Sequence, residues 1–150
     1  MSSIAILVGS VYGGAEELAD HAEKMLQQAG HQTQQFSDAA LTHLLEYNPN
    51  FWLVITSTTG QGDVPANLEA LYFEIKDTTP DLRGKQYAVI AMGDSSYGDT
   101  FCQAGRRFDE VLTESMASQI QPLLEIDACE TMDSVGAAQE WLESLLSKLF

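Results

Sequence analysis

The stretch that decides the fold is residues 4–17, Ile-Ala-Ile-Leu-Val-Gly-Ser-Val-Tyr-Gly-Gly-Ala-Glu-Glu. Its first five residues form an uninterrupted apolar run, which is typical of a strand buried on both faces of a parallel sheet. Gly13 and Gly14 allow a tight turn and a close approach of the backbone to a ligand. A helix is expected from about Ala15, so its unpaired N–H groups would face back into the loop. The stretch therefore predicts either an anion site or an ordinary strand-to-helix turn.

The composition of this first loop narrows the kind of ligand that it could hold. The loop lacks the Gly-Lys-Ser/Thr ending of a nucleotide-binding P-loop, and it also lacks the Gly-x-Gly-x-x-Gly pattern of a dinucleotide site. The first cationic side chain of the sequence is Lys24. A phosphate in this loop would therefore be held by backbone N–H groups and by the hydroxyl of Ser10, without a local positive charge.

The net charge of the chain limits the classes of partner that it can bind. The 150 residues carry 7 basic and 22 acidic side chains, for a formal net charge of -15. This excess of negative charge argues against nucleic acid or a membrane surface as a binding partner, and it favours a basic protein partner. Alternatively, the acidic residues only keep the protein soluble. We recognise no signal peptide and no apolar stretch long enough to span a bilayer. Cys102 and Cys129 form no metal spacing and no disulfide framework, so we expect two free thiols in a reducing cytoplasm. We also expect a monomer.

Apolar runs and helical periodicities alternate along the chain. After the first strand, further strands are predicted over residues 31–36, 51–56, 86–92 and 120–126, of which the last is interrupted at Gln121 and Pro122. Helices are predicted over residues 16–29, 65–76, 101–116 and 135–149, with a brief helix around Leu41–Leu45. The pattern predicts a single α/β domain over residues 1–150, a doubly wound sheet of five parallel strands with helices on both faces.

Three loops that follow strands are rich in Gly, Ser, Thr and Asp. They cover residues 9–14, 57–64 and 93–99. In parallel α/β sheets, ligands bind beyond the carboxyl ends of the strands, where the strand order reverses. We therefore expect these three loops to form one binding site.

With these loops in order, the chain resembles the flavodoxin family over its whole length. The motifs that carry the resemblance are Gly-Ser-Val-Tyr-Gly-Gly-Ala-Glu at 9–16, Ser-Thr-Thr-Gly-Gln-Gly-Asp-Val-Pro at 57–65, and Gly-Asp-Ser-Ser-Tyr-Gly-Asp-Thr-Phe-Cys at 93–102. The chain looks most like short-chain flavodoxins of the MioC/YqcA type, and it is also similar to the FMN domains of diflavin reductases. The resemblance implies a flavodoxin-like fold and FMN as the cofactor.

The resemblance also implies roles for individual residues. The first loop would hold the FMN phosphate, the second would pass the N5 edge of the flavin ring, and the third would cover the other ring face with Tyr97 and bond the pyrimidine edge. The implied cofactor-binding residues are Ser10, Val11, Tyr12, Gly13, Gly14, Ala15, Thr58, Thr59, Gly60, Gln61, Gly93, Asp94, Tyr97, Phe101 and Cys102. Asp94 could instead only cap a turn. No catalytic or metal-binding residue is implied.

The sequence departs from the common family pattern in each of the three loops, and in the third loop the departure is an extra residue between Tyr97 and Phe101. Val11 and Gly14 stand where many relatives carry Thr or Asn, so the first loop has fewer hydroxyl donors and FMN affinity would fall. Thr59 stands where many relatives place an aromatic ring over the flavin.

By resemblance, the chain is a one-electron carrier that takes electrons from an NADPH-dependent flavodoxin reductase and passes them to an acceptor enzyme, both of them basic redox partners. A small FMN-dependent oxidoreductase acting on quinones and a flavin-free interaction module remain alternatives. A receiver domain is disfavoured, since uncharged residues follow the strands where that fold needs acidic ones.

We expect Trp52 in the core and the histidines at 21, 31 and 43 on the surface. Neither cysteine has a neighbour that would activate its thiol.

Overall fold

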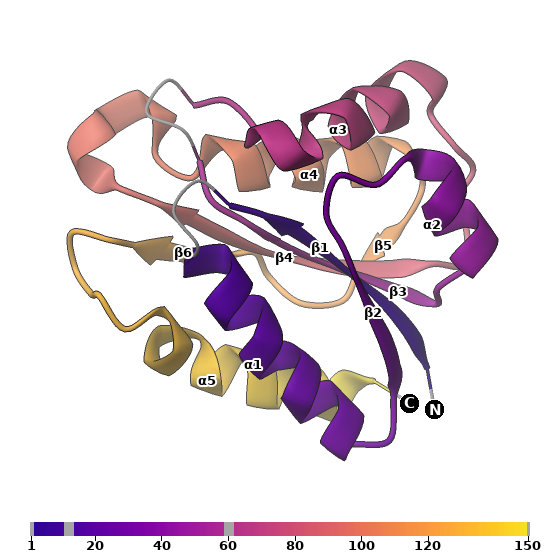
Figure 1. Cartoon of the computed structure of the whole chain (residues 1–150), viewed down its shortest axis with the longest axis horizontal. Coiled ribbons are helices and arrows are strands. Elements are labelled where there is room, and N and C mark those ends of the chain that lie inside the picture. The colour runs from indigo at the N-terminus through magenta and orange to yellow at the C-terminus, as the bar shows by residue number, and fades with distance from the viewer. Residues whose placement is uncertain (1, 11–13, 59–61, 150) are drawn as a thin grey trace.

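A computed structural model describes residues 2–10, 14–58 and 62–149, and for Tyr97 and Asp99 it describes the backbone only. Strands and helices alternate from the first strand onward, as the apolar runs predict (Figure 1). The elements in chain order are β1 (Ser3–Gly9), α1 (Gly14–Gln28), β2 (Gln32–Phe36), α2 (Leu41–Tyr47), β3 (Phe51–Thr56), α3 (Ala66–Thr78), β4 (Gln86–Gly93), the 3₁₀ helix η1 (Ser95–Thr100), α4 (Gln103–Glu114), β5 (Ser118–Gln119), β6 (Leu124–Asp127) and α5 (Ser134–Lys148).

The strands form one parallel sheet in the order β2-β1-β3-β4-β5, and β6 also pairs with β4. Helices α1 and α5 cover one face, and α2, α3 and α4 cover the other (Figure 1). This is the doubly wound arrangement predicted from the sequence. The strand order reverses beside β1, so the edge beyond the ends of β1 and β3 is where a ligand is expected.

The central strands are apolar along most of their length because both of their faces are covered. Every residue of β3 is buried, including Trp52, which is 1% exposed and lies in the core as predicted. Helix α4 approaches β4 closely at Gly105, where an added Cβ would lie 2.3 Å from the Cβ of Ala91. Packing this close fixes where α4 begins relative to the loop that follows β4.

The fifth strand of the sheet is split into β5 and β6, at the interruption seen in the sequence. Pro122 has no N–H group to donate to a ladder, so the strand cannot run through it. Helix α5 supplies hydrogen-bond partners to the segment between β5 and β6. The indole Nε1 of Trp141 donates to the Pro122 carbonyl at 2.7 Å, and the buried Gln121 amide donates to the Trp141 carbonyl at 3.1 Å.

Two local predictions from the sequence are wrong. The loop predicted over residues 93–99 contains η1, and the following helix starts at Gln103 rather than at residue 101, because Cys102 takes a left-handed conformation with φ of 56°. His31 is buried rather than on the surface. Its Nδ1 accepts the backbone N–H of Ser2 at 3.0 Å, and burial lowers its pKa.

Candidate functional site

The carboxyl ends of the central strands lie side by side at one edge of the sheet. Gly9 of β1 is in register with Thr56 of β3, and Thr56 is in register with Ala91 of β4. The loops after these strands therefore leave the sheet together, at the left of the view in Figure 1. Because a Cβ on Gly9 would lie 2.5 Å from the Thr56 hydroxyl oxygen, only glycine allows this close spacing of β1 and β3.

The first loop is anchored by Asn67, which lies in the first turn of α3. Its side-chain oxygen accepts the backbone N–H of Ser10 at 3.2 Å. Its amide nitrogen donates to the Val8 carbonyl and to the Ser37 hydroxyl, both at 2.8 Å. One side chain thus joins the end of β1, the start of the first loop and the loop after β2. The helix that follows, α1, begins at Gly14 and has Glu16 and Glu17 in its first turn.

The second loop is anchored on the first two turns of α4. The Thr58 hydroxyl accepts the backbone N–H of Ala104 at 3.3 Å, and so caps α4 from another part of the chain. Gly62 has φ of 86°, and an added Cβ would lie 1.9 Å from the Gln103 side-chain oxygen. Asp63 then pairs with Arg107 at 3.7 Å. Both flanks of residues 59–61 are therefore held against one helix.

The third loop folds tightly over the end of β4. A Cβ on Gly93 would lie 2.7 Å from the backbone nitrogen of Cys102, so this return of the chain requires glycine. The Asp94 carboxylate caps η1 by accepting the backbone N–H of Ser96 at 2.9 Å. The turn-capping role considered for Asp94 is thus present. If the same carboxylate also contacts a flavin edge, that contact adds to these hydrogen bonds or replaces them.

A fourth segment, after β6, adds residues that the sequence analysis did not select. The Asp127 carboxylate accepts the backbone N–H groups of Ser95 at 3.0 Å and Cys129 at 2.9 Å, and the Cys129 thiol donates to Asp94 at 2.8 Å. These bonds join the third loop to the end of β6. They also lower the pKa of both carboxyls, through Cys129 and Ser96 for Asp94 and through Ser95 for Asp127.

The two cysteines lie in contrasting environments. Cys102 is fully buried, its thiol donates to the Ala91 carbonyl at 3.3 Å, and burial raises its pKa to about 12. Cys129 is exposed. Its thiol is oriented by Asp94, and no cation that would favour the thiolate is bonded to it in the described part of the chain.

Of the fifteen residues that the resemblance selects, the structure brings those that it describes to one edge of the sheet. Six lie outside the described residues: Val11, Tyr12, Gly13, Thr59, Gly60 and Gln61. The predicted stacking of Tyr97 also falls outside, because only its backbone is described. The helix expected from about Ala15 is present and begins one residue earlier, at Gly14, and Ala15 is buried.

The described residues fit a phosphate-bearing planar cofactor. The first N–H groups of a helix have no partner within it, so the start of α1 suits a phosphate, and Gly93 and Cys102 bring the backbone of the third loop to the same edge. Asn67, Thr58 and Asp127 make contacts that join residues far apart in the chain, so the sequence analysis missed these contacts. The one local signal was that each is a polar residue beside a strand end or a helix start.

This fold, with polar loops gathered at the strand ends, is that of a flavodoxin-like protein. The flavodoxin family model matches residues 6–141, and the chain belongs to that family. It is 40% identical over 143 residues to the flavodoxin YqcA of Escherichia coli, covering 95% of each chain, and 37% identical over 146 residues to the MioC homolog of Haemophilus influenzae, covering 97% of this chain and 98% of the other. A solved cysteine-to-serine mutant of flavodoxin from Pseudomonas aeruginosa superposes with a TM-score of 0.91 at 43% identity, covering 97% of each chain.

These similarities confirm the family, the resemblance to the YqcA and MioC proteins, and the fold that the sequence predicts. FMN is the cofactor of this family, as the resemblance implied. Within the described residues, no helix is both long enough and apolar enough to cross a bilayer.

Proposed function

We propose that this chain binds FMN at the edge formed by the four loops and carries electrons one at a time between a reductase and an acceptor enzyme. The observation that carries the proposal is the register of Gly9, Thr56 and Ala91, which brings the family's three cofactor loops together. Membership of the flavodoxin family supports the same activity.

In this proposal, the bound FMN supplies the redox chemistry, and the protein orients it and controls access to it. The start of α1 and Ser10 bind the phosphate, and Asn67 fixes the backbone at Ser10. The backbone near Cys102 offers polar groups to the ring edge. No proton-transferring side chain is needed, since the protein performs no bond cleavage on a substrate.

We also propose that the partners are basic proteins that dock over this edge. The net charge of -15 supports this, as do three carboxylates at the loops, Asp63, Asp94 and Asp127. Hydrogen bonds lower the pKa of Asp94 and Asp127, which keeps both ionised at neutral pH. Negative charge beside the cofactor also disfavours an anionic reduced ring, so the same residues would lower its reduction potential.

The first test is a titration of the purified chain with FMN, followed by stepwise anaerobic reduction monitored by visible absorbance and electron paramagnetic resonance. A paramagnetic signal that is strongest near half reduction supports the one-electron carrier. Binding with a direct two-electron change would indicate the quinone-reducing alternative. Absence of FMN binding would refute the proposal and favour the flavin-free module.

Two further measurements address the ring contact and the partner. Tyr97→Ala should weaken FMN binding by about fivefold or more, since stacking of a large ring contributes about 1 kcal/mol or more. Unchanged affinity would remove Tyr97 from the site.

Reduction by a basic reductase should slow steeply with added salt, whereas a rate independent of salt would contradict docking on an acidic face.

A further inference from the structure

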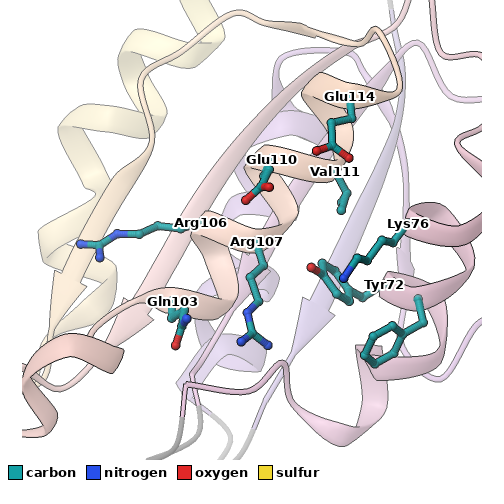
Figure 2. A pocket seen from close by; sticks show the side chains of 9 residues that line it. Tyr72, Lys76, Gln103, Arg106, Arg107, Glu110, Val111 and Glu114 are labelled. Atoms are coloured by element: carbon teal, nitrogen blue, oxygen red, sulfur yellow. The ribbon is translucent and has the colours of Figure 1, made fainter.

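A groove with a cavity volume of about 570 Å³ lies between α3 and α4 (Figure 2). None of its lining residues is among those assigned to FMN above, although Arg107 also pairs with Asp63 of the second loop. Its α3 wall includes Tyr72 and Lys76, which are one helical turn apart. Its α4 wall includes Arg107, Glu110 and Glu114, whose spacing also puts them on one helix face. A volume of this size is typical of sites for small molecules.

Two polar groups of the groove have no bonding partner among the described residues. Tyr72 is 7% exposed. Its ring packs edge-on against those of Phe73 and Phe108, with ring centroids 5.2 and 5.4 Å apart. Among the described residues, neither the Tyr72 hydroxyl nor the Lys76 ammonium has a hydrogen-bond or ion-pair partner, and both point into the groove in Figure 2. The Tyr72 hydroxyl is not one of the fully buried unpaired atoms among the described residues, so it opens into the groove and can bond a molecule held there.

A third donor comes from α4. The Arg107 guanidinium reaches Asp63 at 3.7 Å, a long ion pair, and still lines the groove. Arg106 differs, because it extends away from the groove in Figure 2 and its Nε bonds Glu125 at 2.7 Å. Tyr72, Lys76 and Arg107 thus place three donors along one groove, in a chain that carries only 7 basic residues against 22 acidic ones.

The other groups of the groove restrict the ligand further. Glu110 and Glu114 line the same cavity, so a second negative charge on the ligand would be repelled. Phe73 is 45% exposed at the rim, where it presents a flat apolar surface. Burial raises the pKa of Tyr72, which keeps its hydroxyl protonated and able to donate.

We propose that the α3–α4 groove binds a small aromatic monocarboxylate. Its carboxylate accepts hydrogen bonds from the Tyr72 hydroxyl, the Lys76 ammonium and the Arg107 guanidinium, and its ring packs against Phe73. This site is separate from the FMN site, so the proposal does not depend on the proposed electron-carrier function.

The test is a titration of the FMN-saturated, ¹⁵N-labelled protein with 2-naphthoate, in which binding is measured from the changes in amide chemical shifts. We expect saturable shifts in α3 and α4, no binding of the neutral 2-naphthamide, and weaker binding of the dianionic 2-naphthyl phosphate. Tyr72→Phe and Lys76→Gln should each weaken 2-naphthoate binding about tenfold, since each removes a bond to a charged acceptor. The charge-matched control Lys85→Gln, at a residue that bonds Asn48 elsewhere on the surface, should bind as the wild type does.

Four results would overturn the proposal. One is equal binding of 2-naphthamide, and another is unchanged affinity in both Tyr72→Phe and Lys76→Gln. The third is release of FMN by 2-naphthoate, seen as a rise in flavin fluorescence, because that would place the compound in the flavin site. Absence of shifts in α3 and α4 at any soluble concentration counts equally against it. If the chain does not bind FMN, the same titration on the FMN-free chain decides the matter.

Discussion

Replacing Asn67 by alanine should loosen the first loop and destabilise the protein, because this side chain joins three segments. The amide group makes hydrogen bonds to Ser10, Val8 and Ser37 at 3.2, 2.8 and 2.8 Å. Alanine makes none of them. The variant keeps the helix, since alanine has the highest helix propensity, so the loss reports on the bonds rather than on α3 itself.

The magnitude follows from the number and exposure of these bonds. A hydrogen bond contributes about 1 kcal/mol net, and the one to Ser37 is exposed and contributes less. We therefore expect the free energy of unfolding to fall by about 2–3 kcal/mol, which for a domain of this size lowers the melting temperature by roughly 4–12 °C. FMN affinity should fall as well, because the backbone at Ser10 is no longer fixed.

Urea denaturation of the FMN-free protein measures the first effect, and fluorescence titration with FMN measures the second. Ser37→Ala is the matched control, since it removes a single exposed bond and should cost under about 1 kcal/mol. A loss below about 0.5 kcal/mol in Asn67→Ala, with unchanged FMN affinity, would refute the anchoring role of this residue.

Three further predictions concern packing, pH and thiol reactivity. Gly105→Ala places a Cβ 2.3 Å from that of Ala91 and should cost about 1–3 kcal/mol in urea denaturation; no loss would mean that α4 sits further from β4. Burial lowers the pKa of folded His31 below its usual 6.5, so the unfolded chain binds the proton first as the pH falls. Stability should therefore decline below pH 6.5, and His31→Gln should flatten that part of the profile; an identical profile would contradict this. Iodoacetamide should label the exposed Cys129 well before the buried Cys102, whose pKa is raised to about 12, and equal labelling by mass spectrometry would contradict the burial.

The sequence predicted the fold well because its strongest signals are local. Apolar runs such as residues 51–56 suit only a strand covered on both faces, and the break in the fifth strand follows from Pro122. The start of α1 and the place of the three loops follow from glycine positions and chain order. The chemistry of those loops came from the resemblance to a family rather than from the residues alone.

What the sequence did not predict depends on contacts between distant segments. Asn67 and Ser10 are 57 positions apart, and Asp127 and Ser95 are 32 apart, so no local pattern joins them. The burial of His31 depends on a bond to Ser2 across 29 positions. The 3₁₀ helix after β4 was missed because its residues also favour turns, and Asp94 caps it with a bond that is visible only once the chain has folded.

The split fifth strand also bears on how the sheet meets other chains. A long exposed edge strand offers unpaired N–H and C=O groups that can recruit a strand from another molecule. Here that edge consists of two residues in β5 and four in β6, separated by Pro122, over which the Trp141 indole is bonded. The opposite edge, β2, reads Gln-Thr-Gln-Gln-Phe, and its Thr33 and Gln35 side chains bond acidic residues of α1. The β5–β6 border is therefore a short and interrupted template for the addition of a strand from another molecule.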